Sequence, residues 1–366
     1  MRLSRLSISL VTSLIAIISL MMAAGCCRAE LPVAYQEPHA LHSQVNGIER
    51  REQVHDVASI TIRGVEYCTS LTWLHLVDMG LSNDDIAPLR HMVNLTNLSL
   101  NSNQISDISP LSGLVSLEWL SLQDNEISDI SSLSGLFNLG WLSLDGNLVS
   151  EVSPLSELLN LQELHVRENP VRDIASLTGF VFVRDVLYST SLTSLSLFCA
   201  GLSDEDIAPL RFMSNLMYLY IGGCATCDQE PAEAGSYAQI SDIAVLSELV
   251  HLRALTLTGN QVSDIAPLAY LTNLEELNLV DNLISDISPL ADLTNLVELS
   301  LAHNQIHDIE PLAYLTNLTF LHLSDNQIHD LAPLSGLTNL KWAFLGNNEV
   351  HDWSPVEHVR NVAGRP

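Results

Sequence analysis

Three histidines near the C-terminal end of the chain stand 22 residues apart, and each directly precedes an aspartate. They are His307, His329 and His351. Imidazole nitrogens and carboxylate oxygens are ligands for zinc and copper, so this column could bind metal if the three segments lie side by side. Duplication of one segment explains the same pattern without any metal. The sequence favours duplication, and a metal-binding edge is the alternative.

Large aromatic residues also recur at one position. Each stands directly before the first leucine position of a Leu-x-Leu segment, and four of the five tryptophans are among them: Trp73, Trp119, Trp141, Tyr218, Phe320 and Trp342. Tryptophan and tyrosine often anchor protein interfaces. Aromatic rings can also stack on sugars, or form ladders that stiffen a parallel sheet.

The chain carries no motif that indicates catalysis. It has no glycine-rich phosphate loop, no Gly-x-Ser-x-Gly elbow and no His-Glu-x-x-His motif. Cys224 and Cys227 could be a metal half-site, a redox pair or part of a disulfide, but no further ligands have the spacing of a zinc site. A Cys199–Cys227 or Cys224–Cys227 disulfide remains open, as do free thiols, including Cys68. We predict no enzymatic activity and no cofactor.

The charge balance excludes several classes of partner. The 366 residues include 43 Asp and Glu against 15 Lys and Arg, so the formal net charge is -28. Nucleic acids and anionic membrane surfaces both attract basic patches, and this composition opposes both. Apolar residues make up 47% of the chain, which is enough for a large core.

A repeat of about 22 residues organises the chain from residue 54 to residue 361. Its turn asparagine recurs at Asn103, Asn125, Asn147, Asn169, Asn260, Asn282, Asn304, Asn326 and Asn348, and irregular copies bring the count to about twelve. The two leucines of Leu-x-Leu share one face of a strand and are buried only when repeats stack. The asparagine can bond to backbone groups of adjacent coils. Insertions near 179–191 and 225–238 are expected to form loops.

This frame resembles the leucine-rich repeat of the bacterial internalin type. The stretch that comes closest to its consensus is 293–315, which includes Leu293-Thr294-Asn295-Leu296 and Asp308-Ile309-Glu310-Pro311-Leu312. The resemblance implies an α/β repeat solenoid, a curved horseshoe with a concave parallel β-sheet and short helical or 3-10 segments on the convex side. Internalins also carry a helical cap and an immunoglobulin-like domain. We recognise neither here, so their adhesion function does not follow from the resemblance alone.

An acidic residue precedes the second isoleucine position of every repeat. These residues are Asp85, Asp107, Asp129, Glu151, Asp173, Asp206, Asp242, Asp264, Asp286, Asp308, Asp330 and Asp352. Aspartate is a good N-cap, and the proline that often follows suits a first helical turn. We interpret this column as capping of the convex segments, because uncompensated carboxylates about 5 Å apart would repel one another. A cation-binding stripe is the alternative.

Residues 1–25 resemble a lipoprotein-type signal peptide. Arg2 and Arg5 precede an apolar run, and the segment 23–26 reads Ala-Ala-Gly-Cys, in which Cys26 would be lipidated. Ordinary cleavage and an uncleaved membrane anchor are the alternatives. Residues 26–53 lack periodicity and are expected to form a flexible tether. We therefore expect an exported protein of the cell envelope, lipoprotein or secreted, that contacts membrane only through its anchor.

These patterns predict an exported leucine-rich-repeat protein that binds a protein ligand through its concave face. We expect one patch of Trp119, Trp141, Glu163, His165 and Arg167, and a second patch at the C-terminal end. The full set of candidate ligand-binding residues is Trp73, Trp119, Trp141, Glu163, His165, Arg167, Tyr218, Tyr220, Phe320, Trp342 and Phe344. A carbohydrate-binding surface protein and a structural envelope spacer without a specific ligand are the alternatives. The identity of the partner stays open.

Overall fold

The structure is a computed structural model that describes residues 59–171, 174–178, 181–183, 186–188, 191–223 and 240–365. The expected leader and tether, Cys26 included, lie outside the described residues. The expected second insertion, with Cys224 and Cys227, lies outside them as well. Within the described part of the chain, no helix is long and apolar enough to cross a bilayer.

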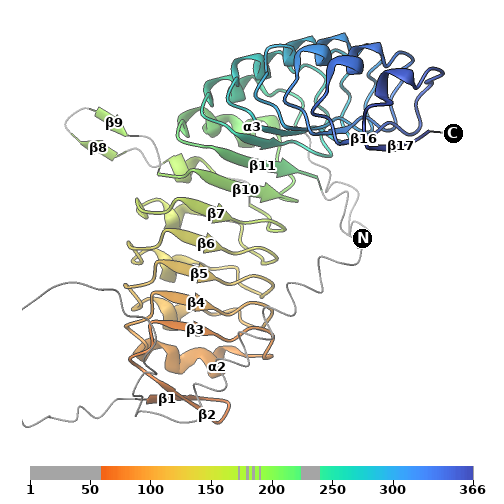
Figure 1. Cartoon of the computed structure of the whole chain (residues 1–366). Helices are drawn as coiled ribbons and strands as arrows, with labels where there is room; N and C mark the ends of the chain where they lie inside the picture. Colours follow the sequence, from red (N-terminus) through yellow and green to blue (C-terminus); the bar gives the residue numbers. More distant parts are fainter. Residues whose placement is uncertain are drawn as a thin grey trace, which may run out of the picture.

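Among the described residues, thirteen short parallel strands form one continuous sheet (Figure 1). They are β3 (Trp73–His75), β4 (Asn97–Ser99), β5 (Trp119–Ser121), β6 (Trp141–Ser143), β7 (Glu163–His165), β10 (Ser194–Phe198), β11 (Tyr218–Gly222), β12 (Ala254–Thr256), β13 (Glu276–Asn278), β14 (Glu298–Ser300), β15 (Phe320–His322), β16 (Trp342–Phe344) and β17 (Asn361–Ala363). Neighbouring strands place leucine opposite leucine, as in Leu98 opposite Leu120. This register stacks the side chains of successive coils in columns.

Short helices lie on the other side of each coil, so that the chain forms a curved solenoid (Figure 1). The α-helices are α2 (Asn83–Ile86) and α3 (Asp204–Ile207). The 3-10 helices are η1 (Ala87–His91), η2 (Ser109–Leu111), η3 (Ser131–Leu133), η4 (Ser153–Leu155), η5 (Ala175–Thr178), η6 (Ala208–Phe212), η7 (Ala244–Glu248), η8 (Ala266–Tyr270), η9 (Ser288–Leu290), η10 (Glu310–Tyr314), η11 (Ala332–Gly336) and η12 (Ser354–Val356). The predicted α/β repeat solenoid with a parallel sheet is confirmed.

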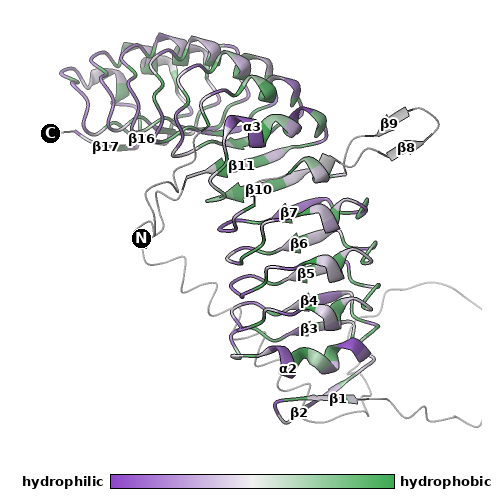
Figure 2. Ribbon diagram, turned by 180° about the vertical axis from the view of Figure 1, so that it is seen from behind, coloured by the Kyte–Doolittle hydropathy of each residue, from purple (hydrophilic) through white to green (hydrophobic). Residues whose placement is uncertain are grey.

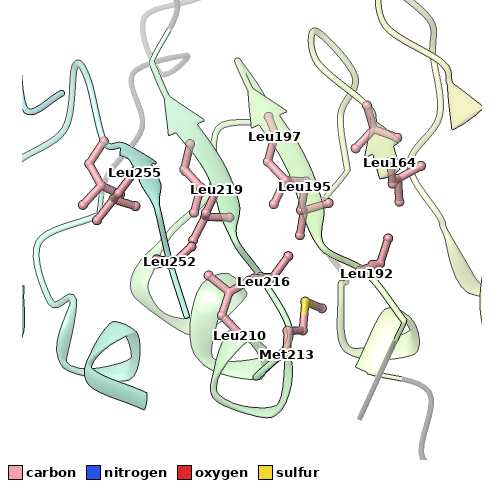
Figure 3. Packing of buried hydrophobic residues seen from close by; sticks show 14 of the residues in the cluster. Leu164, Leu192, Leu195, Leu197, Leu210, Met213, Leu216, Leu219, Leu252 and Leu255 are labelled. Carbon is pink, nitrogen blue, oxygen red and sulfur yellow. The ribbon is translucent and has the colours of Figure 1, made fainter. Parts of the chain in front are cut away.

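The core is a continuous column of leucines and isoleucines inside the coils. Hydrophobic residues recur at the same places in each coil (Figure 2). Leu195, Leu219 and Leu255 come from three neighbouring strands and lie side by side in the interior (Figure 3). Full burial of one such side chain contributes about 1.5–3 kcal/mol. No single coil could cover its own leucines, so stability comes from the stack.

An antiparallel hairpin covers the N-terminal end of this stack. Its strands are β1 (Ser59–Ile62) and β2 (Val65–Cys68). Ile62 and Tyr67 are buried and belong to the core. Arg63 Nη1 donates a hydrogen bond of 2.7 Å to the carbonyl of Met79, and its Nη2 lies 3.2 Å from Asp85 Oδ2. The hairpin thus shields the first coil, whose apolar end would otherwise face water.

The turn asparagines form a buried ladder between coils. Asn304 Oδ1 accepts a hydrogen bond of 3.0 Å from the Ile284 N–H of the preceding coil. Its Nδ2 donates to the carbonyls of Leu279 and Leu301 at 2.9 and 3.1 Å. The expectation that this residue satisfies backbone groups of adjacent coils is confirmed.

Aspartates of the acidic column cap the convex helices, with a shift of one residue from the predicted N-cap position. Asp286 Oδ1 accepts a hydrogen bond of 2.8 Å from the Ser288 N–H, which begins η9. That backbone hydrogen bond lowers the pKa of Asp286. In the two longer repeats the aspartate lies inside the α-helix instead, and Asp85 Oδ2 accepts from the Ser82 N–H at 2.9 Å. Asp173 lies outside the described residues.

The first insertion forms a second antiparallel hairpin, β8 (Val181–Val183) with β9 (Val186–Tyr188). It projects away from the coils (Figure 1). Strand β7 pairs directly with β10, so the hairpin is inserted in a turn and leaves the sheet intact.

Candidate functional site

The strands bring the predicted ligand-binding residues onto one face of the sheet. Trp119 lies opposite Trp141, and Phe320 lies opposite Trp342. The leucines beside them on each strand point into the core, so these alternate side chains face the concave surface. Most of the candidates are half-buried there, whereas Arg167 and Trp342 are exposed.

The N-terminal strands carry a continuous run of rings, here called the tryptophan patch. Trp119 and Trp141 stack with centroids 4.6 Å apart and an interplanar angle of 11°. His75 lies 5.7 Å from Trp73 and 6.3 Å from Trp119. At the other end His165 lies 5.3 Å from Trp141. The patch therefore spans five strands, from β3 to β7.

Charged groups border the tryptophan patch on its C-terminal side. His165 Nε2 lies 3.8 Å from Glu163 Oε2. Asp145 Oδ1 accepts a hydrogen bond of 2.7 Å from the Arg167 N–H, and burial raises the pKa of Asp145. The Arg167 guanidinium lies 5.0 Å above the Phe198 ring, within cation–π range.

The predicted residues of the first patch thus lie close together, and the structure adds two that the sequence prediction left out. His75 joins Trp73 to Trp119, and Phe198 holds the guanidinium of Arg167. Both stand in the alternating strand columns, so following every column along all coils could have identified them.

Serines next to the indole rings are buried although they lie on the concave face. Ser99, Ser121 and Ser143 are all buried, and Gln123 Nε2 donates to Ser143 Oγ at 2.8 Å. In the adjacent column, the rings of Trp119 and Trp141 hold each other in a parallel stack. Rings held in this way offer a rigid apolar surface that loses little entropy on binding.

The C-terminal strands carry a second cluster, here called the phenylalanine patch. Phe344 lies 5.5 Å from Phe320 and 5.3 Å from His322, the latter edge-on at 62°. Burial lowers the pKa of His322, which favours the neutral imidazole. Trp342 stands beside Phe320 in register and is 48% exposed.

Tyr218 and Tyr220 lie between the two patches, on β11. Burial raises the pKa of Tyr220, and the nearby carboxylates of Glu276 and Glu163 raise it further. Glu276 and Glu298 lie in register on neighbouring strands and are exposed. The centre of the concave face is therefore polar and acidic, with aromatic patches on either side.

A groove of about 560 Å³ follows the edge at which strands β10 to β14 begin. Met217, His251 and Arg253 contribute to its lining, and Arg253 Nη2 lies 2.6 Å from Glu275 Oε1. This ion pair raises the pKa of Arg253. Because these two charges compensate each other, the Arg253–Glu275 pair adds no net charge to the groove.

Among the described residues, no group of three or more His, Cys, Asp or Glu side chains could hold a metal ion. His307, His329 and His351 are exposed, and His329 Nδ1 lies 3.4 Å from Glu349 Oε2. The three histidines therefore belong to no group of three or more possible ligands in the part of the chain that the structure describes. Cys199 forms a disulfide.

Family models for leucine-rich repeats match the sequence. One, described as "Leucine Rich repeats (2 copies)", matches residues 93–135 and 272–314. Another, described as "Leucine Rich repeat", matches residues 188–210 and 314–331. Neither describes an enzyme. A search of curated proteins finds no match.

The chain is similar in structure to an internalin from Listeria monocytogenes, with 29% identity and a TM-score of 0.69 over 82% of this chain and 90% of that one. A leucine-rich-repeat protein from Leptospira interrogans has 23% identity and a TM-score of 0.59, over 80% and 77% of the two chains. The Arabidopsis receptor kinase HAESA, solved with the peptide hormone IDA and a co-receptor, has 21% identity and a TM-score of 0.59, over 77% and 51%. The last two likenesses show the fold alone.

Proposed function

We propose that this chain, a leucine-rich-repeat protein of the internalin-like type, binds a protein ligand on the concave face of its sheet. The observation that carries the proposal is the tryptophan patch. Trp119 and Trp141 stack face to face, with their centroids 4.6 Å apart, on the side of the sheet opposite the leucine core, and both stay partly exposed. Large apolar surface left in contact with water is unfavourable, and in soluble proteins it commonly marks a binding site.

The charges on this face support a selective contact. Across its three columns, Glu163, Glu276, Glu298 and Asp145 stand against Arg167, which gives 4 acids and 1 base, a net charge of -3 out of the total of -28. Most of the negative charge thus lies elsewhere. A ligand with apolar side chains at two separated points and polar or basic groups between them would match the two patches and the acidic centre.

The comparison with HAESA supports the same class of ligand at the level of the fold. That receptor is a leucine-rich-repeat relative in structure and was solved with a peptide hormone. A protein of this fold can therefore bind a polypeptide. The residues that would do so in this chain are its own.

The test begins with a pull-down from the native cell envelope, in which the parent chain is the bait. The affinity of the captured protein is then measured for the parent chain and for Trp119→Ala/Trp141→Ala. We expect the double variant to fold and to lose about 2 kcal/mol or more of binding free energy, roughly 30-fold in Kd. Tyr270→Ala/Tyr314→Ala is the matched control, because both tyrosines are exposed, at 67% and 61%, on the convex side. Its binding should equal that of the parent chain.

Other results would overturn the proposal. If the tryptophan variant binds as the parent chain does, the binding site lies outside the tryptophan patch. If that variant unfolds, the stacked rings serve stability and not binding. A hit on a glycan array that the same two substitutions abolish would favour the carbohydrate-binding alternative. If neither a protein nor a glycan is captured, the structural spacer is favoured.

We also propose that the chain is exported and anchored by a lipid on Cys26. The sequence of the leader supports this, because the segment 23–26 reads Ala-Ala-Gly-Cys after an apolar run. Metabolic labelling with a fatty acid should mark the parent chain, and Cys26→Ala should abolish the label and release the protein from the membrane fraction. If the parent chain takes up no label, it is not lipidated, and ordinary cleavage and an uncleaved anchor are the remaining alternatives.

A further inference from the structure

A row of exposed apolar side chains follows one edge of the solenoid, away from the concave face. It consists of Val93, Val115, Phe137 and Leu159, here called the edge row, which are 50–57% exposed. Each lies in the turn between a convex helix and the next strand, on four consecutive coils. With coils about 4.8 Å apart, the row is about 15 Å long.

The fold itself does not require apolar residues at this position. In the C-terminal half the same position holds one exposed valine, Val250, and then Thr272, Thr294, Thr316 and Thr338 on four consecutive coils. The backbone there is held in the same way. Asn138 Nδ2 donates to the Val115 carbonyl at 2.9 Å, and Asn295 Nδ2 donates to the Thr272 carbonyl at 2.8 Å. Exposed valine, phenylalanine and leucine in place of threonine therefore need a reason other than folding.

The residues around the edge row are arranged with opposite charges at its two ends. Arg90 is exposed in the helix beside Val93, and Glu157 is exposed in the turn beside Leu159. Arg90 Nε donates to the Ala87 carbonyl at 2.7 Å, which directs the side chain along the helix surface. Among the described residues, neither charge lies within ion-pair distance of an opposite charge.

The coils between these ends carry no charge at the corresponding positions. Gly113 and Gly135 stand where His91 and Glu157 stand in the outer coils. Small residues let another surface approach the apolar side chains closely. The row is therefore apolar along its length, positive at one end and negative at the other.

We propose that the edge row is a self-association surface, on which a second copy of this chain binds in antiparallel orientation. Val93 then faces Leu159 of the second copy, and Val115 faces Phe137. The same symmetry brings Arg90 opposite Glu157 of the second copy, and a parallel arrangement would place like charges together. Because the two copies have the same distance between coils, the side chains of one edge row stay opposite those of the other along the whole row. A partner with a different repeat distance would fall out of register.

The interface is modest in size and leaves the ligand site free. Four side chains fall short of the roughly 800 Å² per partner of a standard interface, so the dimer is a reversible one. The hairpin β8–β9 leaves the solenoid in the corresponding turn of the next coil after Leu159, so it borders the C-terminal end of the edge row. Because the concave columns point elsewhere, a dimer would present two concave faces at once.

Sedimentation of the full chain over a range of concentrations tests the proposal. The parent chain should pass from monomer to dimer, and Val115→Thr/Phe137→Thr should raise the dissociation constant at least tenfold. Threonine already occupies this position in other coils of the chain, so the melting temperature of the variant should equal that of the parent chain. Thr294→Ala/Thr316→Ala is the matched control and should dimerise like the parent chain. A parent chain that stays monomeric, or a variant that dimerises equally well, overturns the proposal.

Cysteine cross-linking tests the orientation. Val93→Cys mixed with Leu159→Cys should give a covalent dimer under mild oxidation, whereas each variant alone should give no more than the parent chain. In an antiparallel pair, identical positions would lie about 15 Å apart, beyond the reach of a disulfide. Cross-linking of each variant with itself would overturn the antiparallel arrangement. Monomers that bind phosphatidylcholine vesicles through the edge row would overturn self-association in favour of a lipid surface.

Discussion

Replacing one buried asparagine should reveal how strongly the ladder holds the coils together. In Asn304→Ala, the Ile284 N–H and the carbonyls of Leu279 and Leu301 lose their side-chain partner. A buried N–H left without an acceptor costs about 1–3 kcal/mol, and a carbonyl costs less because it has a second lone pair. We expect the free energy of unfolding to fall by about 3 kcal/mol.

Asn260 provides the internal comparison, because its ladder bonding is incomplete. Its Oδ1 is buried without a hydrogen-bond partner among the described residues, while Nδ2 donates to the Leu257 carbonyl at 3.0 Å. Asn260→Ala thus removes fewer hydrogen bonds and also removes an unsatisfied oxygen. It should cost about 1–2 kcal/mol less than Asn304→Ala.

Urea unfolding followed by circular dichroism measures both variants against the parent chain. Hydrogen exchange then locates the effect, since the Ile284 amide should lose protection in Asn304→Ala and keep it in Asn260→Ala. Equal unfolding midpoints for the two variants, together with an unchanged Ile284 amide, would show that leucine packing alone holds neighbouring coils together.

Two further predictions concern the acidic column and the histidines. Asp286→Ala removes the hydrogen bond to the Ser288 N–H and should cost about 1 kcal/mol in urea unfolding; a binding defect without loss of stability would instead favour the cation-binding stripe. Burial lowers the pKa of His75 and His322 below the ordinary value of 6.5, so the unfolded chain takes up protons first as the pH falls. Stability should therefore decline as the pH drops below about 6.5. In thermal melts, His75→Gln/His322→Gln should show a shallower decline than the parent chain, and identical slopes would rule out these two residues as the cause.

Several features were predictable from the sequence because the residues that produce them lie within one repeat, and the repeat recurs along the chain. Leu-x-Leu specifies a short strand with one buried face, and stacking is the only way to bury it. The asparagine and the following aspartate act on backbone groups a fixed number of residues away, as Asn304 and Asp286 show. The columns of the concave face follow from the same two-residue alternation, which is why Trp119 and Trp141 could be placed side by side.

The tertiary structure decided what lies between and beyond these columns. His75 reaches Trp119 across an intervening coil, and Phe198 lies under Arg167, because long side chains on a curved sheet contact more than their direct neighbours. Arg63 ties the first hairpin to the opening coil through contacts 16 to 22 residues away. The edge row was also not predictable from the sequence. The sequence does not show whether a turn directs an apolar residue outward or buries it. Only the path of the turn, fixed by packing on both neighbouring coils, leaves Val115 and Phe137 in solvent.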